Sequence, residues 1–155
     1  MVPRHSIAAV SVAAVVISTA ASAQQASFGT AEEARAMLEK AIAAVKSDKD
    51  GALATFNTGG AGFKDRDLYP FCFNLSDGTF VAAIKGLLGT DTRMLKDPAG
   101  KPFGQDLYAA AQKPEGEITE VSYMFPRPGA DKTPVPKITF VGRAGDLGCG
   151  VGYYK

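Results

Sequence analysis

Residues 68–84 read LYPFCFNLSDGTFVAAI, and they indicate the architecture more clearly than any other stretch of the chain. Aromatic residues stand at alternate positions in the first half: Tyr69, Phe71 and Phe73. Alternation places side chains on one face of a strand. A Ser-Asp-Gly turn at 76–78 follows, and the apolar run 79–84 comes after it. Strand, turn and strand in this order predict a β-hairpin.

Three more strands are predicted towards the C-terminus, at 118–125, 137–143 and 147–154. A loop at 126–136 with four prolines separates the first two, and a Gly-Asp turn precedes the last. Glycines occupy alternate positions of the last strand: Gly148, Gly150 and Gly152. They therefore share one face, where the lack of side chains lets a ligand or another backbone approach closely.

Helices are predicted on both sides of the hairpin. Thr30 and Glu33 form a capping box, and apolar residues then recur at helical spacing over 31–46. A shorter helix is expected at 52–56, before a glycine-rich loop, and another at 103–111. The predicted order is that of an α+β domain: helix, short helix, hairpin, crossover with a helix, and three strands. We expect a long N-terminal helix packed on one five-stranded antiparallel sheet.

The first 23 residues have the features of a secretory signal peptide. Arg4 supplies a positive charge, an apolar core follows, and Ala21-Ser22-Ala23 is an A-x-A cleavage site. An uncleaved membrane anchor is the alternative, but the apolar core is shorter than the ~20 residues that span a bilayer. We expect cleavage after Ala23, a mature domain of residues 24–155, and a periplasmic or secreted location.

Charge and composition exclude several function classes. Lys and Arg number 17 against 16 acidic residues, so there is no basic excess with which to bind nucleic acid. The single histidine, His5, lies in the predicted leader. The mature domain would therefore lack Ser-His-Asp and Cys-His catalysis and every histidine-based metal site. We expect no metal and no cofactor.

Cys72 and Cys149 are the two cysteines of the chain. In an oxidising compartment they are expected to pair, and only one intramolecular bridge is then available. Closing a loop of this size stabilises a fold by roughly 4 kcal/mol in the chain-entropy model. Two buried free thiols are the alternative.

Four short motifs in this order resemble the single Cache domains of type 2. They are the 67–78 hairpin, LKDPAGKPF at 95–103, the pair Val121-Ser122-Tyr123-x-x-Pro126 and Pro136-Lys137, and Gly150-Val151-Gly152-Tyr153. The resemblance implies a PAS-like fold, with a long helix on one sheet face and small molecules bound on the other, beneath the crossover. It also implies extracytoplasmic sensing of small ligands, often short organic acids. First and last strands are adjacent in that topology, which favours the Cys72–Cys149 bridge.

Two departures from the family pattern shape the expected function. Members usually continue into a transmembrane helix and a cytoplasmic output module, whereas this sequence ends at Lys155. We therefore expect a binding module without its own signalling output, for which a membrane receptor or a sensor kinase is a candidate partner. Ala82-Ala83-Ile84-Lys85 also stands where many members place a ligand-contacting histidine.

The candidate ligand-binding residues are aromatic or basic: Tyr69, Phe71, Arg93, Tyr123, Phe125, Arg127 and Lys137. Aromatic rings line pockets but also fill ordinary cores. Lys137 can hold an anionic ligand, or pair with Asp67 or Glu120. Arg93 and Arg127 can each bind a carboxylate through two parallel hydrogen bonds. The alternative is that they are solvated at the surface.

We expect no catalytic residue. The paired acids Asp65 and Asp67 are interpreted as solvated surface near a turn, as are Glu115 and Glu117. Two other function classes remain: a small enzyme that uses Tyr, Lys and Asp in the same pocket, and a protein-interaction subunit for a membrane receptor.

Overall fold

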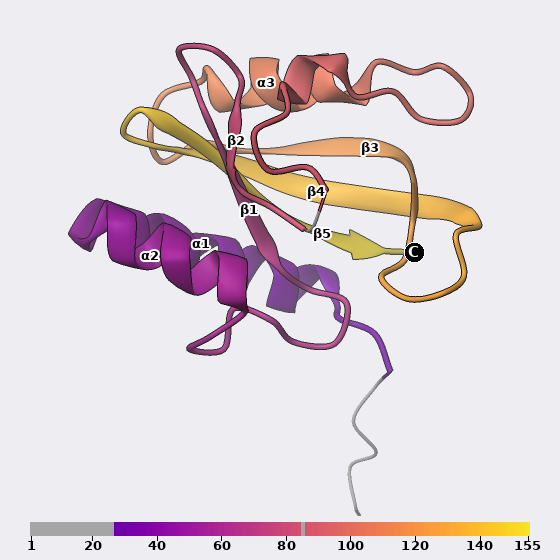
Figure 1. Cartoon of the computed structure of the whole chain (residues 1–155), viewed down its shortest axis with the longest axis horizontal. Coiled ribbons are helices and arrows are strands. Elements are labelled where there is room, and N and C mark those ends of the chain that lie inside the picture. Colours follow the sequence, from indigo (N-terminus) through magenta and orange to yellow (C-terminus); the bar gives the residue numbers. More distant parts are fainter. Residues whose placement is uncertain (1–26, 85) are drawn as a thin grey trace, which may run out of the picture.

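The computed structural model describes residues 27–84 and 86–155, so the predicted leader and its cleavage site lie outside the described residues. The elements follow one another as α1 (Ala31–Ser47), α2 (Lys49–Thr58), β1 (Pro70–Asn74), β2 (Phe80–Ala82), the 3₁₀ helix η1 (Thr92–Met94), α3 (Phe103–Ala111), β3 (Ile118–Pro126), β4 (Pro134–Ala144) and β5 (Leu147–Tyr154). Figure 1 shows them around one sheet. The predicted α+β class is confirmed.

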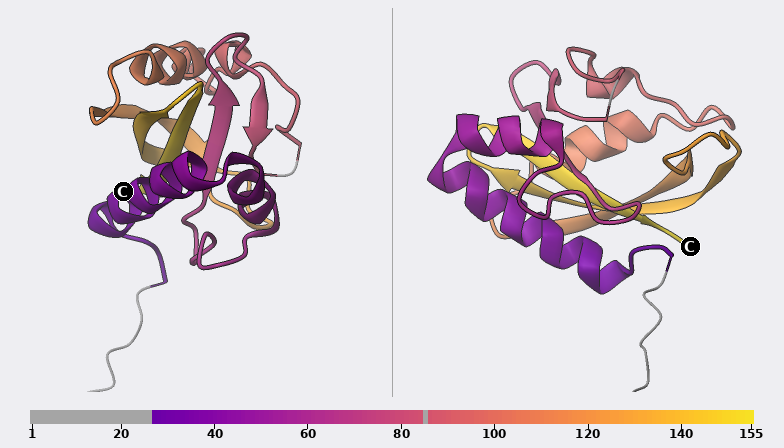
Figure 2. Two further views of the ribbon diagram at one scale, coloured as in Figure 1. Left: turned by 90° about the vertical axis from the view of Figure 1, so that its left-hand side faces the viewer. Right: turned by 60° about the horizontal axis from the view of Figure 1, so that its bottom comes forward.

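The five strands form a single antiparallel sheet in the order β2-β1-β5-β4-β3. Helices α1 and α2 cover one face, and α3 covers the other (Figures 1 and 2). The connection from β2 to α3 lies on the α3 side; we call its residues 83–84 and 86–102 the crossover segment. Two apolar clusters follow from this layering, one beneath α1 and α2 and one beneath α3.

The helix boundaries follow from side-chain caps. The capping box of Thr30 and Glu33 starts α1 as predicted. Asp48 then ends α1 and starts α2, because its carboxylate accepts a hydrogen bond from the amide of Gly51. Helix α2 therefore begins earlier than predicted, and it ends at Gly59, whose φ of 72° suits glycine.

The proline-rich loop between β3 and β4 is shorter than predicted, because both strands extend into it. Pro126 pairs with Pro134, and Met124 pairs with Pro136. The β5 ladder begins only at Lys137, opposite Tyr154, so the prolines have a neighbouring strand on the β3 side alone. A missing amide hydrogen is tolerated at such a position. Strand β2, by contrast, is shorter than the predicted run.

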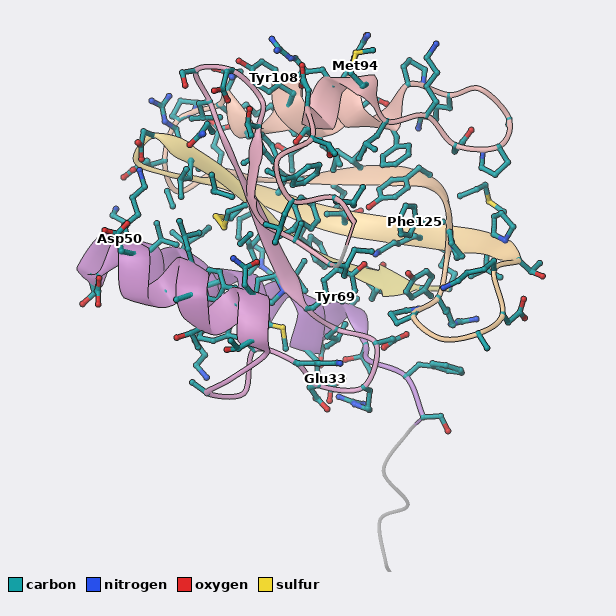
Figure 3. The ribbon with its side chains drawn as sticks, viewed as in Figure 1. Glu33, Asp50, Tyr69, Met94, Tyr108 and Phe125 are labelled. Carbon is teal, nitrogen blue, oxygen red and sulfur yellow. A yellow bond between two sulfur atoms is a disulfide. The ribbon has the colours of Figure 1, made fainter. Side chains whose placement is uncertain are left out.

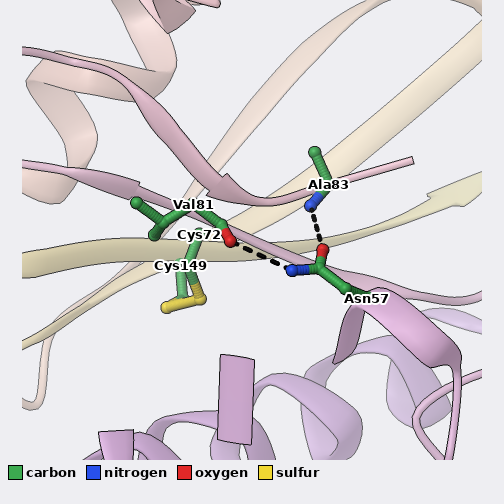
Figure 4. Close-up of a disulfide and its surroundings, with 5 residues drawn as sticks. All are labelled: Asn57, Cys72, Val81, Ala83 and Cys149. Atoms are coloured by element: carbon green, nitrogen blue, oxygen red, sulfur yellow. Dashed lines mark hydrogen bonds between the residues drawn. A yellow bond between two sulfur atoms is a disulfide. The ribbon is translucent and has the colours of Figure 1, made fainter. Parts of the chain in front are cut away.

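Cys72 and Cys149 form the predicted disulfide, directly opposite each other in β1 and β5. Their Cα atoms are 4.1 Å apart and both residues are fully buried. Figure 4 shows the bridge near Asn57 of α2. The side chain of Asn57 forms hydrogen bonds with the edge strand β2 and with the residue that follows it. Its amide donates to the carbonyl of Val81 and accepts from the amide of Ala83, both at 3.2 Å. These contacts tie α2 to β2.

The glycine face of β5 is not open to a ligand. A Cβ atom at Gly148 would enter the ring of Phe73, and one at Gly150 would enter the ring of Phe71. At Gly152 it would meet the side chain of Lys137. The bare backbone therefore accommodates side chains of the protein itself, and it lets a lysine stem lie across the sheet.

Candidate functional site

An apolar pocket lies between the sheet and the crossover segment, on the α3 side. Its floor is formed by side chains of β1, β3 and β4, and its roof includes Ile84, Leu87 and Leu95 of the crossover segment. The cavity volume is about 20 Å³. That is enough for one water molecule but not for an organic ligand. The pocket in this structure is therefore largely filled by its own side chains.

Among the described residues that line the pocket, Lys137 is the charged one, and it is only 3% exposed. It lies on β4, where its side chain crosses the bare backbone at Gly152. Its Nζ atom lies 4.9, 5.0 and 4.8 Å from the ring centroids of Tyr69, Phe125 and Tyr154. It also donates a hydrogen bond of 3.1 Å to the hydroxyl of Tyr69. Aromatic faces and one phenol thus surround the amine.

The electrostatics of Lys137 are unfavourable for a charge. None of the ion pairs among residues 27–84 and 86–155 involves it. Burial lowers the pKa of Lys137 from its ordinary value of 10.5 to about 7, against the opposing charge of Asp67. The alternative in which Lys137 pairs with Asp67 or Glu120 is not found: Asp67 lies beside Arg127, and Glu120 is exposed.

The aromatic wall of the pocket is packed tightly. Phe103 of α3 stacks on Tyr123 of β3, with ring centroids 4.0 Å apart and an interplanar angle of 5°. Phe125 meets both rings edge-on. The Tyr123 hydroxyl shares a 2.8 Å hydrogen bond with Thr139. Burial raises the pKa of Tyr123, as it raises those of Tyr69 and Tyr154, so these phenols stay protonated at neutral pH.

Arg127 does not line this pocket. Its guanidinium lies between the rings of Phe28 and Tyr154, with its carbon 4.1 and 5.0 Å from their centroids. Its Nε atom is 3.9 Å from Oδ2 of Asp67. The interpretation of Asp67 as solvated surface is wrong, because this carboxylate is 5% exposed and its Oδ1 accepts a 2.7 Å hydrogen bond from the amide of Gly29.

Arg93 does not line the pocket either. It pairs with Asp91 and donates to the carbonyl of Asp77 in the hairpin turn. Its guanidinium carbon lies 5.2 Å from the ring centroid of Tyr108. Figure 3 shows Tyr108 and Met94 in the outer layer with α3, whereas Tyr69 and Phe125 lie close to the sheet. Arg93 therefore holds the crossover segment to the hairpin.

Five of the seven predicted residues lie together in the pocket lining: Tyr69, Phe71, Tyr123, Phe125 and Lys137. Sequence reasoning missed Tyr154, although alternation with Gly152 and Gly150 indicated that its ring shares their face. It also missed the apolar roof: Ile84 was assigned to the predicted strand run 79–84 and Leu95 to the motif at 95–103, without a role in the pocket.

The described residues contain no cluster of three potential metal ligands among His, Cys, Asp and Glu. None of the helices in the described part of the chain has the length and apolar character to cross a membrane.

Comparisons with known proteins agree with this geometry. The family model described as "Single Cache domain 2" matches residues 7–153. No curated protein matches the chain. The solved "Periplasmic sensor domain of chemotaxis protein" has 25% identity and a TM-score of 0.59, with 79% of this chain and 88% of that chain covered.

Two further solved structures are similar in fold. A methyl-accepting chemotaxis protein from Vibrio parahaemolyticus has 24% identity and a TM-score of 0.60, and 79% of this chain aligns with 86% of it. A structure titled "Structural basis for carboxylic acid recognition by a Cache chemosensory domain" has 20% identity and a TM-score of 0.62, covering 79% and 91% of the two chains.

Proposed function

Because the chain belongs to the single Cache domain 2 family, we propose that it binds a small organic acid, without altering it, in the pocket beneath the crossover segment. The family and the structural neighbours are sensor domains, which bind small molecules and respond to them. A chemosensory neighbour carries a title that names carboxylic acid recognition, which supports an acid as the ligand class.

Lys137 is the observation that carries the proposal. A buried ammonium without a carboxylate partner is energetically costly, and an anionic ligand compensates that cost. A carboxylate at Nζ gains a charge-assisted hydrogen bond, and the hydroxyl of Tyr69, 3.1 Å from Nζ, is placed to donate a second. The apolar walls then suit a short aliphatic chain rather than a polyanion.

Ligand entry requires the roof to move. The cavity of about 20 Å³ is far smaller than a two- or three-carbon acid. Ile84, Leu87 and Leu95 lie on the crossover segment, outside the five strands, but residues 89 and 90 of this segment bond the backbone of Phe80 in β2. The roof side chains must therefore move while those backbone bonds hold. Such a displacement gives a sensor a bound state that differs from its free state.

The physiological setting follows from the same family. We propose that the domain works outside the cytoplasm after cleavage behind Ala23, and that it reports to a membrane receptor or sensor kinase. Among the described pocket residues, phenols and rings surround Lys137, and no ion pair with a carboxylate is found there. The acid is expected to leave unchanged.

Thermal melting against a panel of acetate, propionate, lactate and pyruvate tests the proposal, with the matching alcohols and amides as uncharged controls. Binding at a hundredfold excess over Kd stabilises the protein by about 2.7 kcal/mol. We expect stabilisation by at least one acid, none by the controls, and loss of the effect in Lys137→Met but not in Lys96→Met. Stabilisation by the uncharged controls, or a changed ligand in the NMR spectrum afterwards, would reject the proposal.

A further inference from the structure

Lys137 is unusual among the lysines that the structure describes, because the others are not buried. Lys46 and Lys49, for example, pair with the carboxylates of Glu115 and Asp146 at the surface. Around Nζ of Lys137 the structure places three aromatic faces and one hydroxyl instead. The aromatic faces attract a cation, but the near-complete burial of the side chain opposes the charge, so Lys137 has more of the neutral, nucleophilic amine than an exposed lysine.

Tyr69 supplies a proton relay beside that amine. Its hydroxyl lies 3.1 Å from Nζ, and burial raises its pKa, so the phenol keeps its proton at neutral pH. A phenol in this position can accept a proton from the attacking nitrogen and pass one to the oxygen of the substrate. Amine and hydroxyl thus form the nucleophile and proton-transfer pair that carbonyl addition requires.

The apolar surroundings favour condensation over hydrolysis. Phe125 and the crossover residue Leu95 line the same pocket, and its volume of about 20 Å³ leaves no room for bulk water. The same volume admits no organic molecule until the roof moves. A carbonyl compound with only one or two further carbons therefore requires the smallest displacement of the roof.

We propose that Lys137 captures small carbonyl compounds, aldehydes or 2-oxo acids of two or three carbons, as a reversible imine, with Tyr69 relaying the protons. The lone pair of Nζ attacks the carbonyl carbon, and the π electrons move to the oxygen. Both protons of the neutral amine are transferred to that oxygen, which leaves as water while the C=N bond forms. No oxidant or reductant is required, and addition of water reverses the step.

This inference rests on the proposed function only in sharing its pocket. An organic acid binds the charged amine, whereas a carbonyl compound reacts with the neutral amine. Because Lys137 is near its midpoint of ionisation at neutral pH, both forms of the amine are present. A 2-oxo acid carries both a carboxylate and a carbonyl group, so it can interact with either form.

Reductive trapping tests the proposal. The purified protein is incubated at pH 7 with acetaldehyde in one arm and pyruvate in another, each with cyanoborohydride, and adducts are located by intact mass and peptide mapping. We expect a single adduct per chain at Lys137, formed about tenfold or more faster than at Lys96 or Lys113, since its neutral fraction is larger. An adduct in the acetaldehyde arm alone identifies aldehydes as the ligands, and one in both arms extends the class to 2-oxo acids.

Matched variants separate this proposal from the previous one. Lys137→Arg keeps a cation but has no nucleophilic amine, so it should lose the adduct; circular dichroism verifies its fold. Tyr69→Phe should slow adduct formation at the same lysine, and Lys96→Arg should leave it unchanged. Adducts confined to exposed lysines would overturn the capture proposal, while acid-dependent melting in the same preparation would leave the proposed function standing. An adduct at Lys137 without acid-dependent melting would support the capture proposal and reject the proposed function.

Discussion

Replacement of Lys137 by methionine should stabilise the domain while it removes ligand binding. Burial lowers the pKa of this lysine to about 7, and the unfolded chain retains the ordinary value of 10.5. Between these values the unfolded state binds more protons than the folded state, so the stability of the unsubstituted domain rises with pH across this window and is lowest below pH 7. Methionine is neutral in both states and adds no such dependence.

The size of the effect follows from the two pKa values. At 1.36 kcal/mol per unit, the ionisation penalty relative to a neutral side chain is about 4 kcal/mol at pH 7 and about 2 kcal/mol at pH 9. Loss of the hydrogen bond to Tyr69 subtracts about 1 kcal/mol. Lys137→Met should therefore be more stable by about 3 kcal/mol at pH 7 and by about 1 kcal/mol at pH 9.

Urea unfolding at both pH values measures this difference directly. The matched control is Lys96→Met on the crossover segment, where an exposed lysine is replaced and a change within about 0.5 kcal/mol is expected. A destabilised Lys137→Met at pH 7, or a gain that does not shrink by pH 9, would show that the buried ammonium does not carry the cost assigned to it.

Three further outcomes are expected. Affinity for a monocarboxylate should fall about tenfold from pH 6 to pH 8 in calorimetric titrations, because the acid binds protonated Lys137; a flat profile argues against a role for the lysine. Gly150→Ala should lower unfolding stability by about 1–3 kcal/mol, as its methyl group enters the ring of Phe71, and an unchanged urea midpoint contradicts that packing. The double substitution Cys72→Ala and Cys149→Ala should cost roughly 4 kcal/mol; equal stability with and without the bridge would contradict its contribution.

Local rules were sufficient for much of the fold. The capping box at Thr30 sets the start of α1, and alternation in 68–75 places Phe71 and Phe73 on one face, because both effects depend only on near neighbours. The long β3–β4 hairpin was under-predicted, since proline is excluded only where a strand has neighbours on both sides. Pro134 has one neighbour, and only the sheet topology reveals it.

The site required more than local rules. Alternation brought Tyr69 and Tyr123 to the pocket face, but the position of Lys137 depends on Gly152 in a neighbouring strand, which makes room for its stem. The two predicted arginines lie elsewhere because each has another partner: Arg93 pairs with the neighbouring Asp91 and bonds the hairpin turn at Asp77, and Arg127 lies beside a residue distant in the sequence. For Arg127 that partner is Asp67, whose burial no local pattern indicated.

A crystal structure of the domain with the acid that stabilises it most is the decisive measurement. We expect the carboxylate within hydrogen-bond distance of Nζ of Lys137 and of the Tyr69 hydroxyl, with Leu87 and Leu95 displaced from the positions they hold in the closed pocket. A carboxylate bound outside this pocket, or a crystal grown at saturating acid with the pocket still closed and empty, would contradict the account.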